Sequence, residues 1–150
     1  MNKRERYRMS LAIVDIRRSK LERARMEALA VQHMQKQAVE GLLRSEHAMQ
    51  ACLAGLNAAL TNAAGLSTVL VDQWMHATET SRDHWQRARL IEHQAGERVA
   101  GSRCELYIRE KEFDDAQRSS RWAQRDYQKK LDEKRMATIE DQFMMQGKPR

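Results

Sequence analysis

Imidazole and carboxylate side chains that could ligate a metal ion are grouped at His76, Glu79 and Asp83. Spacings of three and seven residues place all three on one face of a helix. A di-metal carboxylate site, however, needs Glu-x-x-His on each of two helices and further Glu ligands. The chain lacks that set, and its remaining histidines form no close cluster with these three residues. We therefore expect no metal site and no cofactor.

Groups that perform covalent or phosphate chemistry follow no recognisable catalytic pattern in this chain. The sequence contains neither a glycine-rich phosphate-binding loop nor the Gly-x-Ser-x-Gly turn that presents a nucleophilic serine. We therefore expect no enzymatic activity, and the remaining candidate residues are candidates for binding.

Aromatic and basic side chains are interleaved most densely near the C-terminus. The set comprises Phe113, Arg118, Arg121, Trp122, Arg125, Tyr127, Lys129 and Lys130. On a helix, Arg118, Trp122 and Arg125 lie on one face. A Trp flanked by Arg is typical of the residues that anchor protein interfaces, and it is equally typical of a ring packed along the edge of a helix pair. The sequence leaves both interpretations open.

Charge is distributed unevenly along the chain. Residues 1–25 carry nine Lys or Arg against three acidic residues, whereas no Lys or Arg occurs from Ser45 to Ser81. A basic segment can bind nucleic acid by releasing counterions from the phosphates, but no helix-turn-helix, zinc-finger or RNA-binding signature is present. We expect a solvated helix face, with a patch for an acidic protein partner left open. A basic coiled coil that binds nucleic acid is kept as an alternative.

The segment from His47 to Val71 carries no charged residue, and its 25 residues are long enough to span a bilayer. Polar residues such as Asn57 and Asn62 would be costly there, so a membrane-associated hairpin is only a further alternative. A turn between two helices cannot hide all the apolar side chains of this region, and we expect an exposed tip that binds a partner. These side chains are Leu53, Leu56, Leu60, Leu66, Leu70 and Trp74.

The composition predicts long helices. Ala, Glu, Lys, Leu and Arg supply 72 of 150 residues, close to the half that is typical of coiled coils. The single proline, Pro149, interrupts no predicted helix. Leu, Ile, Val and Phe number only 26, too few to fill a globular core. No signal peptide is visible, and Cys52 and Cys104 make no disulfide framework, so we expect a reducing cytoplasm.

Apolar residues recur every seven positions in both halves of the chain, as in a coiled coil. In the first half the repeat runs through Tyr7, Val14, Leu21, Ala28, Gln35, Leu42, Met49, Leu56 and Ala63. We predict a second row four residues later, at Leu11, Arg18, Arg25, Gln32, Val39, Glu46, Leu53 and Leu60. In the second half the two rows are Val99, Leu106, Phe113, Ser120 and Tyr127, and Ala95, Ser102, Arg109, Ala116 and Ala123.

Between the two periodic halves the sequence predicts a turn. Gly65 can adopt the positive φ that closes a helix, and Ser67 or Thr68 can cap the helix that follows. Asp72 is expected in the first turn of that helix, where a negative charge is favourable.

We therefore predict an all-α fold: a long two-helix antiparallel coiled-coil hairpin in a single domain, residues 1–150. Arm one covers about 3–62, the turn about 63–67 and arm two about 68–145, so that arm two extends about 25 Å past arm one. Gly96 and Gly101 inside arm two indicate a bend or a close approach of two backbones, since each costs about 1 kcal/mol relative to Ala in a helix.

The C-terminal arm resembles a known family. Glu112-Phe113, Arg121-Trp122 and the run from Arg125 to Lys130 are similar to the C-terminal arm of type III secretion stalk proteins, the YscO-like and FliJ-like proteins. The chain length and the basic first helix, with the run Arg17 to Ala24, are similar as well. The architecture resembles the family along nearly the whole chain, the side-chain pattern only in the short C-terminal segment.

This resemblance implies a non-enzymatic cytoplasmic stalk at the membrane-associated base of a secretion apparatus, reaching the membrane only through its partners. The implied partners are a hexameric export ATPase, an export gate protein and secretion chaperones, with no nucleic acid. The residues expected to contact the ATPase are Arg4, Arg6, Arg121, Trp122, Arg125, Lys129 and Lys130. Those expected to contact the gate or chaperones are Leu56, Leu60, Leu66 and Trp74.

Overall fold

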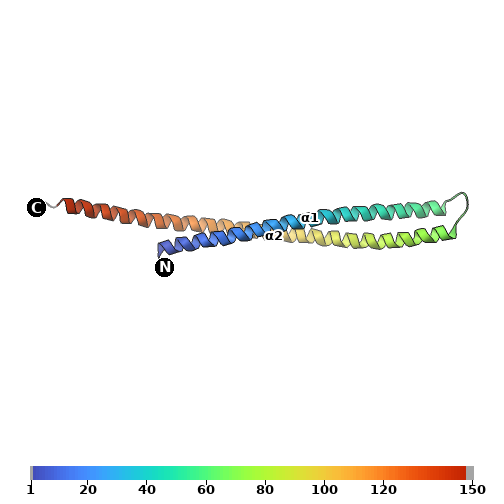
Figure 1. The fold of residues 1–150 in the computed structure, drawn as a ribbon, viewed down its shortest axis with the longest axis horizontal. Helices are drawn as coiled ribbons and strands as arrows, with labels where there is room; N and C mark the ends of the chain where they lie inside the picture. The colour runs from blue at the N-terminus through green and yellow to red at the C-terminus, as the bar shows by residue number, and fades with distance from the viewer. Residues whose placement is uncertain (1, 148–150) are drawn as a thin grey trace. The chain divides into compact units, whose positions relative to one another are not determined.

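The chain folds into two long α-helices that run antiparallel. The computed structural model describes residues 2–147. Helix α1 spans Lys3–Leu60 and helix α2 spans Thr68–Gln146, and residues 61–67 form the loop that joins them (Figure 1). No β-strand occurs among the residues that the structure describes. The all-α two-helix hairpin predicted from composition and heptad spacing is confirmed.

Contacts between the helices define two compact units. The terminal unit combines Met1–Arg25 with Glu105–Arg150, and the turn unit comprises Met26–Cys104. Each unit pairs one segment of α1 with one segment of α2.

The seam of α1 is made of one predicted row and one that the sequence analysis placed wrongly. In the predicted row Val14, Leu21 and Ala28 are buried. The second row lies three residues after the first, not four: Ser10, Arg17, Ala24, Val31, Ala38, Ser45, Cys52 and Ala59 are buried or half-buried. The residues predicted for that row are exposed, except for the half-buried Glu46: they are Leu11, Arg18, Arg25, Gln32, Val39, Leu53 and Leu60.

The physical reason for this difference is the size of the residues that face one another. Ser10 Oγ lies 3.3 Å from Ser120 Oγ, which gives the register of the two helices. Fourteen residues further along α1 and fourteen earlier on α2, this register sets the small Ala24 level with the large Leu106. Where α2 supplies a large side chain to the seam, a small residue of α1 fits opposite it without overlap. The larger Leu11 of α1 is left 41% exposed.

The seam of α2 agrees with its prediction in both rows. Val99, Ala116 and Ser120 are buried. The other predicted positions are half-buried: Leu106, Phe113, Tyr127, Ala95, Ser102, Arg109 and Ala123.

Side chains of Asn and Ser cap the helix ends near the expected positions. At the start of α1, Asn2 Oδ1 accepts from the Arg4 N–H at 3.5 Å, and Glu5 accepts from the Asn2 N–H at 3.1 Å, as in a capping box. At the start of α2, Ser67 Oγ accepts from the Leu70 N–H at 3.4 Å. Asp72 lies beyond the first turn of α2, which contains no acidic residue, so that part of the prediction is wrong.

Gly65 has the expected positive φ, 115°, but not the expected role. Helix α1 already ends at Leu60, so Gly65 does not cap it. Its N–H donates to the carbonyl of Asn62 at 3.3 Å, and Asn62 Oδ1 accepts from the Ala64 N–H at 3.1 Å. Gly65 therefore shapes the loop between the helices, in which the Asn62 side chain accepts a hydrogen bond from the backbone two residues later.

The close approach between helices occurs at Gly55 and not at the two glycines singled out in arm two. A Cβ at Gly55 would lie 2.6 Å from the ring of Trp74, so only glycine leaves room for that indole. A Cβ at Gly96 would lie 3.9 Å from Gln35 Nε2, an ordinary contact, and one at Gly101 would meet nothing within 4 Å.

Candidate functional site

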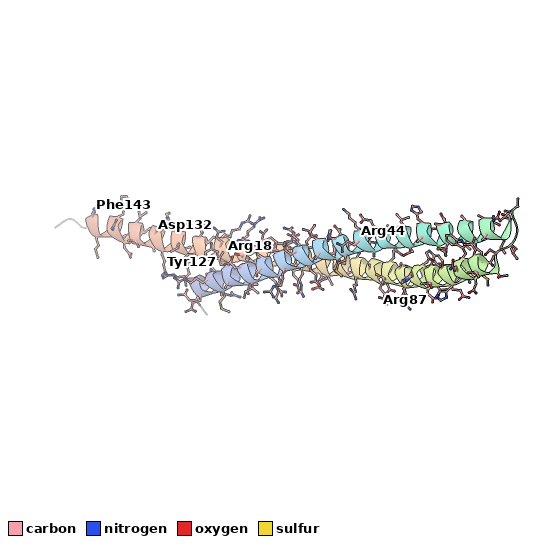
Figure 2. The ribbon with its side chains drawn as sticks, turned by 45° about the vertical axis from the view of Figure 1, so that its right-hand side comes forward. Arg18, Arg44, Arg87, Tyr127, Asp132 and Phe143 are labelled. Carbon is pink, nitrogen blue, oxygen red and sulfur yellow. The ribbon has the colours of Figure 1, made fainter. Side chains whose placement is uncertain are left out.

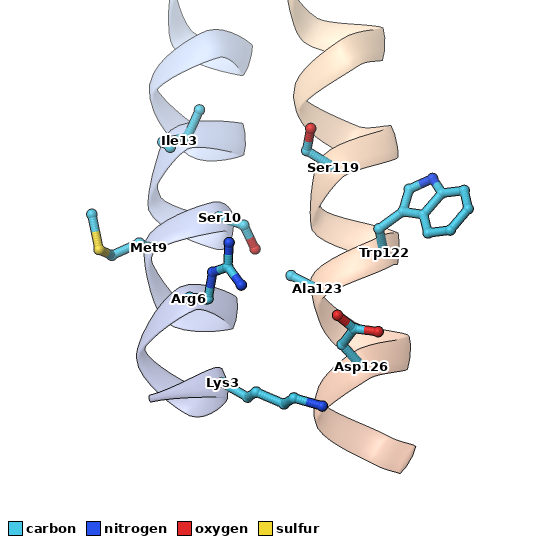
Figure 3. A pocket seen from close by; sticks show the side chains of 9 residues that line it. All are labelled: Lys3, Arg6, Met9, Ser10, Ile13, Ser119, Trp122, Ala123 and Asp126. Carbon is cyan, nitrogen blue, oxygen red and sulfur yellow. The ribbon is translucent and has the colours of Figure 1, made fainter. Parts of the chain in front are cut away.

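A groove of about 420 Å³ lies between α1 and α2 in the terminal unit (Figure 3). Both helices contribute to it, α1 with its first three turns and α2 with the turns around Trp122. The lining residues are Lys3, Arg6, Met9, Ser10, Ile13, Ser119, Trp122, Ala123 and Asp126.

Small seam residues make the floor of the groove. Ser10 and Ala123 face each other between the two helices in Figure 3. Ser10 Oγ donates to the carbonyl of Tyr7 at 2.7 Å, and the neighbouring Ser120 is buried. Tyr7 and Tyr127 stack on each other, with ring centroids 6.1 Å apart. The floor is thus held in place by hydrogen bonding and stacking, and a hollow remains because no large side chain fills it.

Large apolar side chains stand along both edges of the groove. Met9 is 55% exposed and Ile13 47% on the α1 side, and Trp122 is 66% exposed on the α2 side. Figure 3 shows Met9 and Trp122 on opposite sides of the two helices. Exposed apolar side chains grouped beside a hollow are typical of interaction sites.

Basic side chains lie in and beside the groove. Helix α1 contributes Lys3 and Arg6 to the lining, and on α2 Arg118, Arg125 and Lys129 share the face of Trp122 at spacings of four, three and seven residues. All but the half-buried Lys3 are exposed. Asp126 is the single acidic residue of the lining. Within residues 2–147 the ion pairs involve other side chains, so this positive charge is not neutralised by short internal contacts.

An ion-pair cluster in the same unit joins the two helices. Arg17 of α1 lies 2.5 Å from Glu112 of α2, and Glu112 also accepts from Arg109 at 2.9 Å. Arg109 lies 2.6 Å from Glu105 as well. The hydrogen bond from Arg109, with the charge of Arg17, lowers the pKa of Glu112 although partial burial opposes this shift. Hydrogen bonds to Glu112 and Glu105 raise the pKa of Arg109.

The structure brings together some of the residues expected to contact an ATPase. Arg6 and Trp122 line the groove from opposite helices. Arg125 and Lys129 lie with Trp122 around a shallow depression on α2. Arg4 and Arg121 are exposed but do not line the groove. Lys130 is half-buried, at the position where the seam of α2 ends.

The apolar half of this site was not predicted from the sequence. Met9 and Ile13 were not singled out, nor were Lys3 and Asp126. A signal was present, because Met9, Ile13 and Ile16 follow the spacing i, i+4, i+7 of a second apolar stripe on α1. Ile16 is 56% exposed, so the stripe lies outside the seam.

The residues expected to contact a gate or chaperone divide into two kinds. Leu56 and Trp74 are half-buried between the helices of the turn unit. Leu60 and Leu66 are 52% and 62% exposed, and Val69 in the first turn of α2 is 66% exposed. Leu60 and Leu66 are therefore free to meet a partner, whereas Leu56 and Trp74 hold the turn unit together.

The part of α2 beyond Leu131, residues 132–146, is exposed throughout. Figure 2 marks Asp132 and Phe143 on this part of the helix. Its apolar residues Met136, Ile139 and Phe143 form one stripe at i, i+3, i+7, while Lys134 and Asp141 occupy the positions that continue the seam. One of the two seam rows of α2 therefore becomes polar beyond Tyr127.

Two sequence features that suggested other chemistry have no counterpart in the structure. His76, Glu79 and Asp83 are exposed, and residues 2–147 contain no group of three His, Cys, Asp or Glu side chains able to hold a metal ion. Over the same residues, neither helix has a stretch apolar enough to cross a bilayer.

Comparisons of the chain with models of protein families, with curated proteins and with solved structures gave no match. The groove of the terminal unit is thus an apolar hollow with a Trp at its edge, beside exposed basic side chains that form no ion pair within residues 2–147.

Proposed function

We propose that this chain is a non-enzymatic coiled-coil stalk of a type III secretion export apparatus. The terminal unit docks into the hexameric export ATPase, and the exposed residues of the turn unit contact the export gate or secretion chaperones. The stalk works in the cytoplasm at the membrane-associated base of the apparatus, reaches the membrane through its partners and binds no nucleic acid.

The observation that carries this proposal is the groove of the terminal unit. Arg6 and Trp122 were selected from the sequence for ATPase contact, and they line the same hollow from opposite helices. An exposed Trp among arginines is the composition of an interface anchor. The second interpretation of Trp122, packing along the helix pair, is not favoured because 66% of the residue is exposed.

The apolar end of the turn unit supports the second half of the proposal. Leu60, Leu66 and Val69 are each more than half exposed, and no charged residue occurs from His47 to Val71. An uncharged apolar surface of this kind is costly in water and favours a protein partner.

The hydrolysis rate of the export ATPase, titrated with this protein, tests the ATPase contact. We expect saturable stimulation by the wild type and at least a tenfold loss of apparent affinity in the Trp122→Ala, Arg125→Ala variant. Arg87→Glu is the control, because Arg87 is exposed in the turn unit. No binding and no change in rate would refute the ATPase contact.

Substitution of Leu60 and Leu66 by Ser tests the tip. Both side chains are largely exposed, so the variant should keep its helical circular dichroism and its unfolding midpoint. We expect secretion to be abolished in cells that carry it. Normal secretion would show that these two leucines do not contact the gate or the chaperones.

A further inference from the structure

We infer that the groove of the terminal unit recognises an acidic amphipathic segment of its protein partner, with an apolar side chain in the hollow and carboxylates beside it. This inference rests on the proposed function, and it specifies the chemistry that the partner presents. The apolar side chain is seated on Ser10 and Ala123 between Met9, Ile13 and Trp122. The carboxylates lie against Arg6 and Arg125.

The shape of the groove favours an inserted side chain over a flat contact. Its volume of about 420 Å³ is within the range of about 300–1,000 Å³ found for ligand pockets. The small floor residues leave depth, and the edges offer Met9, Ile13 and Trp122 as apolar contact surface. Met adapts to irregular shapes because its side chain is unbranched, and a Trp ring provides a large contact area.

The positive charge beside the groove determines which partner residues can lie next to the inserted side chain. Lys3 and Arg6 line the groove, and Arg125 and Lys129 lie with Trp122 in the adjoining depression on α2. A partner with carboxylates at this distance gains charge-assisted hydrogen bonds, and a partner with basic residues is repelled. The positive charge therefore excludes basic amphipathic helices.

Asp126 opposes the positive charge of the site. It lines the end of the groove that also holds Lys3, away from Ile13 and Ser119 (Figure 3). A partner carboxylate close to Asp126 would meet a like charge, so Asp126 weakens the attraction of Arg6 and of the adjacent Arg125 for acidic residues. Removal of the Asp126 charge should then tighten binding.

The same residues do not suit nucleic acid. Proteins that bind single strands stack successive bases on several aromatic side chains. In this unit Tyr7 and Tyr127 already stack on each other, 6.1 Å apart, and are half-buried. Trp122 is the one aromatic residue of the groove lining, and the opposite edge, Met9 and Ile13, is aliphatic.

The test uses the full chain with Trp74→Phe and Trp85→Phe, which leaves Trp122 as the fluorescent reporter. The probe is a synthetic helical peptide with Leu at i and i+4 flanked by Glu. Matched peptides replace Glu by Gln, Glu by Lys, or Leu by Ser. We expect saturable change in Trp122 emission with the Leu/Glu peptide, at least tenfold weaker binding of each matched peptide, and weaker binding at high salt.

Variants of the chain test whether the peptide binds in the groove. Arg6→Glu should weaken the Leu/Glu peptide at least tenfold, Asp126→Asn should strengthen it a few-fold, and Arg87→Glu should leave it unchanged. Circular dichroism and the unfolding midpoint confirm that each variant is folded, because all three residues are exposed.

Three results would overturn the inference: no response of Trp122 to the Leu/Glu peptide, equal binding of the Lys peptide, or a response to a single-stranded oligonucleotide at lower concentration than to the peptide. The assay contains no ATPase. Peptide binding without ATPase stimulation would therefore refute the stalk function alone, and stimulation without peptide binding would refute the acidic segment alone.

Discussion

Glu112 is the residue on which the ion-pair cluster of the terminal unit centres. It accepts from Arg109 on its own helix and contacts Arg17 on the other, at 2.9 Å and 2.5 Å. The Glu112 side chain is 31% exposed. Water therefore screens the ion pairs, and their contribution to the stability of the fold is modest. The direction of the pKa shift nevertheless fixes how that contribution depends on pH.

We predict that the terminal unit loses stability in acid through Glu112. A carboxyl whose pKa is lower in the folded chain than in the unfolded chain stabilises the fold above the ordinary value of 4.5, and the effect disappears as pH falls through the folded pKa. Urea unfolding between pH 7 and pH 3 should show a smaller loss in Glu112→Gln than in the wild type. Glu140→Gln, at an exposed residue of α2, is the control. Equal pH dependence in all three proteins would contradict the prediction.

Gly55 and Gly101 provide a second test of residue-level packing. Gly101→Ala should stabilise the chain by about 1 kcal/mol, because Ala is the better helix former and its methyl meets open space. Gly55→Ala should lose that gain and destabilise by roughly 1–3 kcal/mol, since the new methyl overlaps the Trp74 ring. Urea midpoints give the energies, and Trp74 emission, with Trp85 and Trp122 replaced by Phe, should shift to the red in Gly55→Ala only. Equal midpoints would show that Trp74 can move aside freely.

At the scale of the elements, α2 was predictable and α1 only in part. Both rows of the α2 seam follow from the sequence, because Val99, Leu106 and Phe113 are the large residues at heptad spacing. In α1 the larger Leu11 and Leu53 favoured a predicted second row that lies one position after the observed row, and both leucines are exposed. A helix that faces large residues needs small ones, and this requirement is visible only when the partner and the register are known.

The candidate site was predictable to the same extent. Arg6 and Trp122 could be selected from charge and aromatic content, since those properties belong to single residues. The groove itself could not, because its floor depends on which small residues of α1 and α2 lie level with each other. Ser10 and Ala123 are unremarkable in the sequence, and they form a hollow only in this register.

The last part of α2 should behave as an unsupported helix. Residues 132–146 are exposed, and isolated helices shorter than about 12–15 residues are marginal in water. We predict that their amide hydrogens exchange far faster than those of α2 between Ala95 and Tyr127, where the seam is packed. Slow exchange throughout would contradict this and would mean that another surface covers Met136, Ile139 and Phe143. Repeating the measurement at lower protein concentration would tell whether that surface belongs to a second copy.

At the scale of the molecule, little apolar surface is removed from water. Among the described residues seven apolar side chains are buried, none of them completely, while twenty-five large apolar residues are exposed. Stability is therefore spread over many small seam contacts and over the helical hydrogen bonds, without a central core.

We predict a low heat capacity of unfolding as a result. Globular proteins average about 12–15 cal/mol/K per residue, which for a chain of this length is about 1.8–2.3 kcal/mol/K. Differential scanning calorimetry should give a clearly smaller value, since the heat capacity increment follows the apolar area exposed on unfolding. A value within the globular range would show that the chain buries additional apolar surface in solution.

A few specific pairs of the terminal unit oppose sliding of one helix along the other. The rest of the seam repeats every seven positions, so a displacement by one heptad would again place seam residues opposite seam residues. Arg17 would then leave Glu112, and Tyr7 would lose Tyr127. Ser10 would move from Ser120 to face Phe113 or Tyr127. These few pairs therefore fix the register of the two helices, whereas the rest of the seam would also accept a shift by one heptad.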